Sequence, residues 1–120
     1  MAQQSSIAPL IRIDGTTFSE MSRASLAWLQ TNHQAVNALN VFPVPDGDTG
    51  TNMLLTMKAA CEALEGSVSS SAGSVAHMLS SGALTGARGN SGVILSQIWR
   101  GLARGLKDVD QFSTKEFAEA

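Results

Sequence analysis

The chain has 120 residues, of which 43% are hydrophobic and 15% charged, and its formal net charge at pH 7 is −2. That length suffices for one small domain or part of one, but not for a nucleotide-binding domain plus a substrate domain of usual size. The acidic balance and the absence of a basic run argue against binding to nucleic acid or to an anionic membrane surface. So apolar and thinly charged a chain suggests that part of its surface is normally covered.

Cysteine content and hydropathy indicate the cellular compartment in which the protein is expected. Cys61 is the only cysteine, which excludes an internal disulfide and a cysteine-based zinc site. Residues 1–9 lack the basic and then apolar pattern of a signal peptide, and no run of about 18 apolar residues indicates a transmembrane segment. We therefore expect a soluble, unexported, cytoplasmic protein.

Residues 1–16 are predicted to form an N-terminal arm that runs into a turn at Asp14-Gly15. Thr17 and Glu20 have the spacing of a capping box, and the apolar residues that follow recur at roughly helical spacing. The first helix is therefore expected over Phe18–Ala38.

The middle of the chain predicts three further helices. Val41–Pro45 alternates like a strand, but its two prolines predict a stiff extended arm instead. A second helix is expected from about Thr51, with Gly66 placed to end it, and a third ends near Gly86. The glycine-rich loop 86–92 then opens a fourth helix, so two loops of similar design each lead into a helix start.

The C-terminal residues predict the start of a fifth helix. Ser113 and Glu116 form a second capping-box pattern, yet the sequence stops at Ala120. We expect an all-α fold with about five helices, in a domain that is C-terminally incomplete.

The stretch Pro45–Gly50 places Asp46 and Asp48 on either side of a glycine, after a rigid proline arm. Two carboxylates so close together suit a small, hard cation. An EF-hand loop beginning at Asp46 would need Gly where Thr51 stands and Glu where Met57 stands, so calcium of that type is excluded. Mg²⁺ on a nucleotide fits better, because Mg²⁺ completes its shell with water and substrate phosphates.

Two helix N-termini, after Gly50 and after Gly89, could hold those phosphates through backbone N–H groups. Neither a Walker A motif nor a dinucleotide-binding fingerprint is present. An Asp-Gly-Asp string alone is more often a turn than a metal site, and Arg88 is either a surface cation or a group that neutralises phosphate charge. Both alternatives stay open on the residues alone.

Two long motifs carry a family resemblance. Residues 39–53, LNVFPVPDGDTGTNM, and residues 86–97, GARGNSGVILSQ, closely resemble the N-terminal kinase domain of the bacterial fatty acid kinase catalytic subunit. More distantly, the chain is similar to the nucleotide-binding subunit of dihydroxyacetone kinase, in a family also called Dak phosphatase-like. The similarity runs from about Ile11 to the end of the chain.

The resemblance implies an antiparallel up-and-down barrel of about eight helices, of which about five are present in residues 17–120. It also implies ADP or ATP and two Mg²⁺ ions at one end of that barrel. Asp46 and Asp48 match metal-binding aspartates of the motif. A further aspartate of the dihydroxyacetone kinase pattern falls at Val41 here, which leaves Asn40 as the nearby polar candidate for a third metal ligand.

The remaining site residues follow from the same resemblance. Arg88 is our hypothesis for a catalytic residue beside the metal-binding aspartates. Nucleotide contacts are expected from two segments, namely Thr49, Gly50, Thr51, Asn52 and Met53 in the first and Gly89, Asn90, Ser91 and Gly92 in the second.

The implied activity is phosphoryl transfer from ATP to the carboxylate of a fatty acid held by a separate fatty-acid-binding protein, giving an acyl phosphate. The alternatives are a dihydroxyacetone kinase nucleotide-binding subunit and a nucleotide-binding regulatory module without turnover. A homodimer is left open.

Overall fold

A computed structural model of the chain describes residues 11–39, 47–67 and 69–120. These residues form five helices: α2 (Gly15–Ala38), α3 (Thr49–Glu62), α4 (Ala72–Thr85), α5 (Gly89–Gly105) and α6 (Thr114–Glu119). Extended pairing within the described ranges is limited to one isolated antiparallel bridge, between Ile13 and Phe112. The all-α prediction is confirmed.

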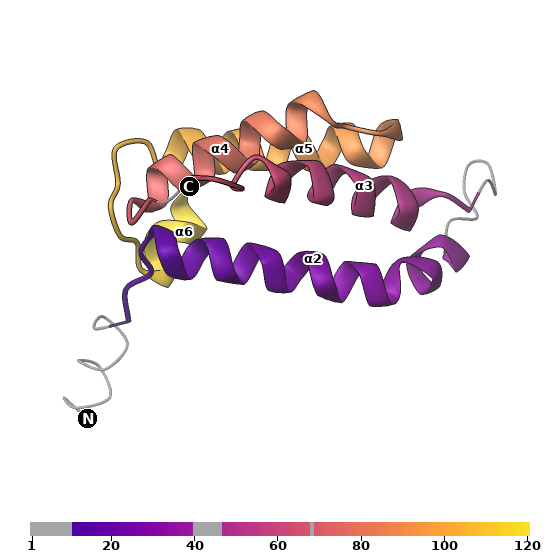
Figure 1. Ribbon diagram of the computed structural model, residues 1–120, viewed down its shortest axis with the longest axis horizontal. Helices are drawn as coiled ribbons and strands as arrows, with labels where there is room; N and C mark the ends of the chain where they lie inside the picture. Colours follow the sequence, from indigo (N-terminus) through magenta and orange to yellow (C-terminus); the bar gives the residue numbers. More distant parts are fainter. Residues whose placement is uncertain (1–10, 40–46, 68) are drawn as a thin grey trace.

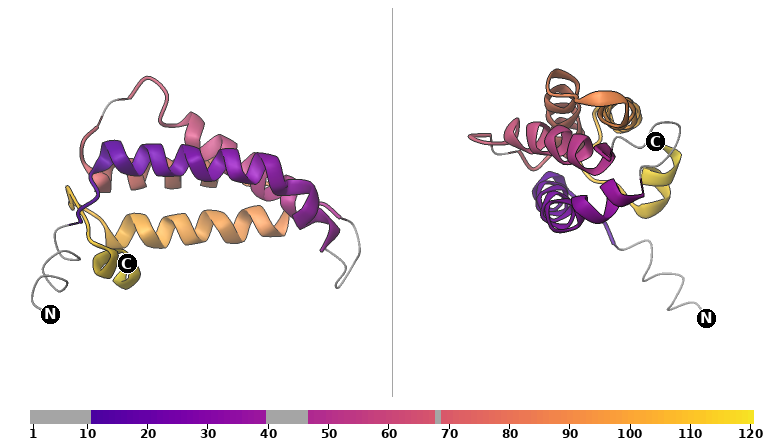
Figure 2. Two further views of the ribbon diagram at one scale, coloured as in Figure 1. Left: turned by 90° about the horizontal axis from the view of Figure 1, so that it is seen from below. Right: turned by 90° about the vertical axis from the view of Figure 1, so that its right-hand side faces the viewer.

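Consecutive long helices run in opposite directions (Figure 1). The chain passes along α2, returns along α3, and repeats this with α4 and α5, so α3 and α5 begin at the same end of the molecule. In the end-on view of Figure 2, α3 lies between α2 on one side and α4 and α5 on the other. The up-and-down arrangement therefore brings the two predicted loop-helix starts to one end.

The core surrounds α3 and α4 and draws residues from every long helix except α5. Its fully or nearly buried apolar side chains are Phe18, Leu29, Met57, Ala60, Cys61, Leu64, Ala72, Val75, Ala76, Leu79, Ala83, Leu106 and Phe112. Phe18 and Phe112 pack edge to face with ring centroids 5.2 Å apart, and Trp99 of α5 approaches Phe18 at 6.0 Å. Cys61 is one of these core residues, and burial raises the pKa of its thiol while the Arg23 charge partly opposes that rise.

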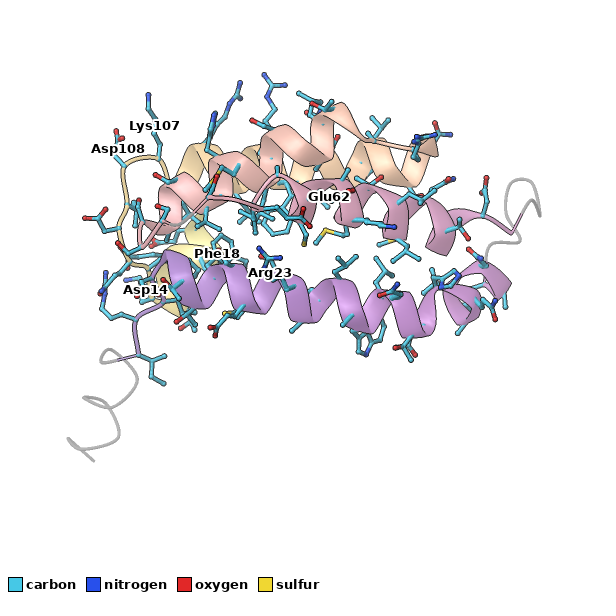
Figure 3. The ribbon with its side chains drawn as sticks, in the orientation of Figure 1. Asp14, Phe18, Arg23, Glu62, Lys107 and Asp108 are labelled. Atoms are coloured by element: carbon cyan, nitrogen blue, oxygen red, sulfur yellow. The ribbon has the colours of Figure 1, made fainter. Side chains whose placement is uncertain are left out.

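The first helix begins three residues earlier than its sequence pattern predicts. Asp14 is the N-cap residue, and its carboxylate accepts a hydrogen bond of 2.9 Å from the Thr17 amide. The Gly15 amide donates to the carbonyl of Ser70 at 2.8 Å, which anchors the helix start to the loop before α4. Figure 3 labels the neighbouring Asp14 at this start of α2. The predicted capping box at Thr17 and Glu20 is therefore wrong, and Asp14-Gly15 is a helix start instead of a turn.

The other predicted boundaries lie close to the observed ones. At Ser113 the hydroxyl accepts from the Glu116 amide and the Glu116 carboxylate accepts from the Ser113 amide, so the second capping box is confirmed. Gly86 is the C-cap of α4, as expected. Helix α3 ends at Glu62, and Gly66 follows it with φ +74° after a short turn.

Large apolar side chains are also exposed on several helices, including α2 and α5. Trp28 on α2 is 62% exposed, and Ile94 and Ile98 on α5 are 62% and 55% exposed. The spacing of the apolar residues in α2 and α5 correctly indicates helices, but it does not identify which face of each helix packs against the core. Even so, across the described ranges we find no helix with the length and hydropathy needed to cross a membrane.

Candidate functional site

The N-terminal turns of α3 (residues 48–52) and α5 (residues 88–92) meet at one end of the molecule, which we call the site end. The Ser91 hydroxyl donates to the carbonyl oxygen of Thr49 at 3.2 Å. At Gly89, which has φ +66°, a side chain would collide with the amide group of Asn52. Segments that are about forty residues apart in sequence are thus in direct contact.

Helix α3 is held at its start by a residue of α2. Asn37 accepts a hydrogen bond from the Thr51 amide at 3.0 Å and donates to the Thr51 hydroxyl at 2.9 Å. One side chain therefore satisfies the third amide of α3 and fixes the hydroxyl of the same residue. The sequence analysis missed Asn37, because nothing in its spacing distinguishes it from the other polar residues of α2.

Three of the predicted nucleotide-contact residues of α3 differ in exposure and surroundings. Gly50 is buried against the backbone carbonyl of His33, and Met53 packs against the hydrophobic core. Asn52 is partly buried, and its side chain lies beside Gly89. Within the described residues, Gly50 and Met53 therefore support the loop, whereas Asn52 lies at its junction with the second loop.

Asp48 is the exposed N-cap residue of α3, and its side chain forms no capping hydrogen bond to the helix. An exposed carboxylate at a helix start is a suitable hard-oxygen ligand for Mg²⁺. The other predicted metal ligands, Asp46 and Asn40, lie outside the described residues. Among the residues that are described, no group of three His, Cys, Asp or Glu side chains could hold a metal ion.

Helix α5 begins with amides that have no protein partner in the described structure. Arg88 is its N-cap residue, with an extended backbone and no capping hydrogen bond from its side chain. The fourth amide, of Gly92, donates to the Arg88 carbonyl, but those of Gly89, Asn90 and Ser91 meet no acceptor among the described residues. Gly89 and Asn90 are also exposed. Such a row of amides at the positive end of a helix dipole is suited to an anion.

A buried threonine connects the two helices just below these starts. The Thr56 hydroxyl donates to the carbonyl of Asn52 at 2.8 Å and accepts from the Arg88 amide at 3.1 Å. Gly92 packs directly against this hydroxyl, leaving no room for a side chain. This close approach of α5 to α3 explains the glycine.

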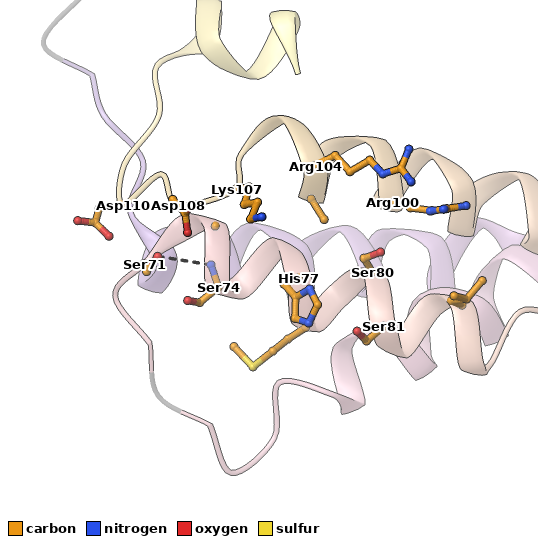
Figure 4. Close-up of a pocket in the computed structure, with 14 residues that line it drawn as sticks. Ser71, Ser74, His77, Ser80, Ser81, Arg100, Arg104, Lys107, Asp108 and Asp110 are labelled. Atoms are coloured by element: carbon orange, nitrogen blue, oxygen red, sulfur yellow. Dashed lines mark hydrogen bonds between the residues drawn. The ribbon is translucent and has the colours of Figure 1, made fainter.

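A prominent groove lies elsewhere, between α4 and α5 (Figure 4). It has a volume of about 1000 Å³ and contains the cations Arg100, Arg104 and Lys107 together with several serines. None of the predicted site residues lines it. We place the candidate site at the helix starts and not in this groove, because phosphate binding of the predicted kind needs accessible backbone amides.

Comparison with known proteins gives a consistent result. Residues 43–120 match the model of the DAK2 domain, a dihydroxyacetone kinase-related family. The chain is 50% identical over 108 residues to Protein YloV of Bacillus subtilis, covering 90% of this chain and 20% of that protein. It is 48% identical over 109 residues to an uncharacterized protein of Staphylococcus saprophyticus, covering 91% and 20% respectively.

An uncharacterized protein of Staphylococcus aureus is 44% identical over 109 residues, again covering 91% of this chain and 20% of that protein. The chain thus spans about a fifth of the length of the curated relatives it matches. The family model matches well over half of the chain, including the start of α3 and the whole of α5. The chain belongs to the DAK2 domain family.

Proposed function

We propose that this chain is the nucleotide-binding part of a Mg²⁺-dependent phosphotransferase that uses ATP. The observation that carries the proposal is the row of amides at Gly89, Asn90 and Ser91, which lies against the motif helix that carries Asp48. Anion-binding amides and a hard-oxygen ligand at one end of a bundle are the two components that a Mg-nucleotide needs. Membership of a kinase-related family supports the same conclusion.

Each group then has a defined role. The amides at the start of α5 bind phosphate oxygens, and the exposed Asp48 carboxylate, with Asp46 and Asn40 as further ligands, holds Mg²⁺. Mg²⁺ held there would neutralise part of the phosphate charge. The exposed Arg88 guanidinium adds a positive charge beside the same amides. The protein contributes position and charge, and no residue is required as a nucleophile.

For the acceptor we propose a fatty acid carboxylate that a separate binding protein presents in the cytoplasm. A carboxylate oxygen attacks the γ-phosphorus of ATP, the bond from that phosphorus to the bridging oxygen breaks, and ADP leaves. The product is an acyl phosphate. The match to the DAK2 domain favours a second candidate acceptor, a small hydroxy-ketone such as dihydroxyacetone, whose hydroxyl oxygen would attack the same phosphorus and release its proton to solvent.

Calorimetric titration of the 120-residue chain with ADP, with and without Mg²⁺, tests the nucleotide site directly. We expect binding that strengthens when Mg²⁺ is added, and a folded chain with no ADP affinity would contradict the proposal. Transfer of labelled phosphate from ATP to a protein-bound fatty acid or to dihydroxyacetone then separates the acceptors. Binding without transfer to either one would favour a regulatory module.

A further inference from the structure

We propose that Thr56 is a positioning residue that couples Mg²⁺ binding at the first loop to nucleotide binding at the second. The proposal rests on the proposed function, because it concerns the same site. Thr56 was not among the predicted site residues, and its side chain is fully buried, so it touches neither ligand. Its effect would act entirely through the backbone atoms that it holds.

The hydrogen-bonding capacity of a hydroxyl explains the direction of this contact. A threonine hydroxyl has one donor hydrogen and two acceptor lone pairs. The hydrogen of Thr56 points to the carbonyl of Asn52, one helical turn earlier in α3, so a lone pair remains for the Arg88 amide. This contact joins the fully buried Thr56 side chain on α3 to a partly buried amide at the start of α5, and that amide would lose its protein partner if the hydroxyl were removed.

The contact forms part of a continuous chain of hydrogen bonds. The Arg88 amide donates to Thr56, the Thr56 hydroxyl donates to Asn52, and the Asn52 amide donates to the Asp48 carbonyl at 2.9 Å. One end of the chain is the residue predicted to bind metal. The other end is the N-cap residue of α5, immediately before the three amides that meet no acceptor in the described part of the chain.

Packing makes the arrangement sensitive to small displacements. Gly92 lies against the Thr56 hydroxyl, and Gly89 lies against the side chain of Asn52, so two of the glycines of the second loop contact this chain of hydrogen bonds. If Thr56 releases Arg88, the amides shift relative to Asp48 while each loop keeps its own ligand groups. Metal and phosphate affinities would then survive separately, but their mutual enhancement would fall.

The test is the Mg²⁺ enhancement of ADP affinity, defined as the ratio of the dissociation constants measured without and with Mg²⁺. Thr56→Val keeps the shape of the side chain but removes the hydroxyl. We expect the enhancement to fall about tenfold, the factor corresponding to the loss of one hydrogen bond near the upper end of the usual range. Thr56→Ser keeps the hydroxyl and should restore most of the enhancement.

Thr31→Val is the control, because the exposed Thr31 hydroxyl makes the same bond to a carbonyl one turn earlier, and no hydrogen bond from it to a second helix is found among the described residues. Its enhancement should equal that of the wild type. An equal loss of affinity with and without Mg²⁺ in Thr56→Val would mean a merely structural role. An enhancement that is unchanged in Thr56→Val would also overturn the proposal.

Amide hydrogen exchange separates failure of this proposal from failure of the proposed function. The Arg88 amide should be protected in the wild type and in Thr56→Ser, and exposed to exchange in Thr56→Val, whether or not ADP binds. A wild type that binds no ADP would overturn the proposed function and the coupling together. Unprotected Arg88 in a wild type that does bind ADP would overturn the coupling alone.

Discussion

The helix N-termini at the two ends of the bundle differ in their capping. At the end opposite the site end, which we call the capped end, the side chains of Asp14, Ser71 and Ser113 cap α2, α4 and α6. At the site end, neither α3 nor α5 is capped by its own N-cap residue. Helices begin at both ends of the bundle. The two ends differ in whether the side chain of the N-cap residue accepts a hydrogen bond from the first amides of the helix.

Helices α4 and α5 illustrate the contrast most clearly. In α4 the amides of Ala72 and Gly73 donate to loop carbonyls at 2.9 and 2.7 Å, and the amide of Ser74 donates to the Ser71 hydroxyl. The corresponding three amides of α5 have no acceptor among the described residues. The start of α4 is therefore stabilised by contacts within the protein, whereas the start of α5 has amides that meet no acceptor among the described residues and that a ligand can bind.

The largest effect that we predict tests the close approach of the two helices at the site end. Gly92→Ala places a methyl group against the Thr56 hydroxyl, so α5 must move away from α3. We expect the free energy of unfolding to fall by about 1–3 kcal/mol, the usual cost of overpacking. Thermal denaturation followed by circular dichroism measures it.

Gly101→Ala is the control in the same helix, because nothing lies within 4 Å of the added methyl group. That substitution should raise the free energy of unfolding by about 0.5–1 kcal/mol, through higher helix propensity alone. Equal effects of the two substitutions would show that the helices do not meet as closely as described.

The next largest effect concerns the metal-binding role of Asp48. Asp48→Asn removes one negative charge from an exposed N-cap residue and keeps its size. We expect ADP affinity in the presence of Mg²⁺ to fall by about tenfold or more, equivalent to about 1.4 kcal/mol, while affinity without Mg²⁺ changes little. Asp110→Asn, an exposed aspartate at the capped end, should leave both affinities unchanged. The same loss of affinity in both variants would mean only a general charge effect.

The third prediction concerns a substitution that gives α5, at the site end, the kind of N-cap found at the capped end. Arg88 has the extended backbone of an N-cap residue, so Arg88→Ser should supply the missing capping oxygen to the α5 amides. We expect the free energy of unfolding to rise by about 1 kcal/mol and ADP affinity to fall, because the serine competes with phosphate for the same amides. Denaturation and titration of one sample measure both quantities.

Arg88→Ala separates the two effects, since it removes the guanidinium without adding a cap. Its ADP affinity should fall, but its stability should stay close to that of the wild type. If Arg88→Ser is no more stable than Arg88→Ala, the α5 amides are already satisfied and the contrast between the ends fails.

Much of the fold can be predicted from the sequence, because capping residues and glycines close to each helix end determine where the helix begins and ends. Ser113 and Glu116 form the predicted capping box, and Gly86 ends its helix as expected. The start of α2 was misplaced because Thr17 and Glu20 satisfy the same pattern as a true cap. The deciding contacts come from Asp14 and from a loop carbonyl that is distant in sequence.

The candidate site could be predicted only in part from the sequence, because some of its contacts join residues that are distant in the chain. The two glycine-rich loops were recognised, and their roles as ligand-binding segments remain predictions. Asn37 and Thr56 were missed because their importance arises from pairing between helices, which spacing within one helix does not encode. Met53 was grouped with the nucleotide contacts because it adjoins the motif, but its side chain faces the core.

The smallest effect that we predict is the response of the capped end to acid. The hydrogen bond from the Ser113 amide lowers the pKa of Glu116 below its ordinary value of 4.5, and the ion pair with Arg12 at 3.2 Å acts in the same direction. A lowered pKa means that ionised Glu116 stabilises the folded state. This contribution is complete above pH 4.5 and is lost as the pH falls through the lowered value.

Helix α6, whose Phe117 stacks on Phe112, should therefore loosen below pH 4.5 before α5 does. Amide exchange or chemical shifts of residues 113–119, recorded as the pH falls from 6 to 3, would detect the change. Glu116→Gln keeps an acceptor oxygen for the Ser113 amide but cannot ionise, so its α6 should lose this pH dependence. If α6 in that variant loosens over the same range as in the wild type, the acid response of the capped end arises from another group.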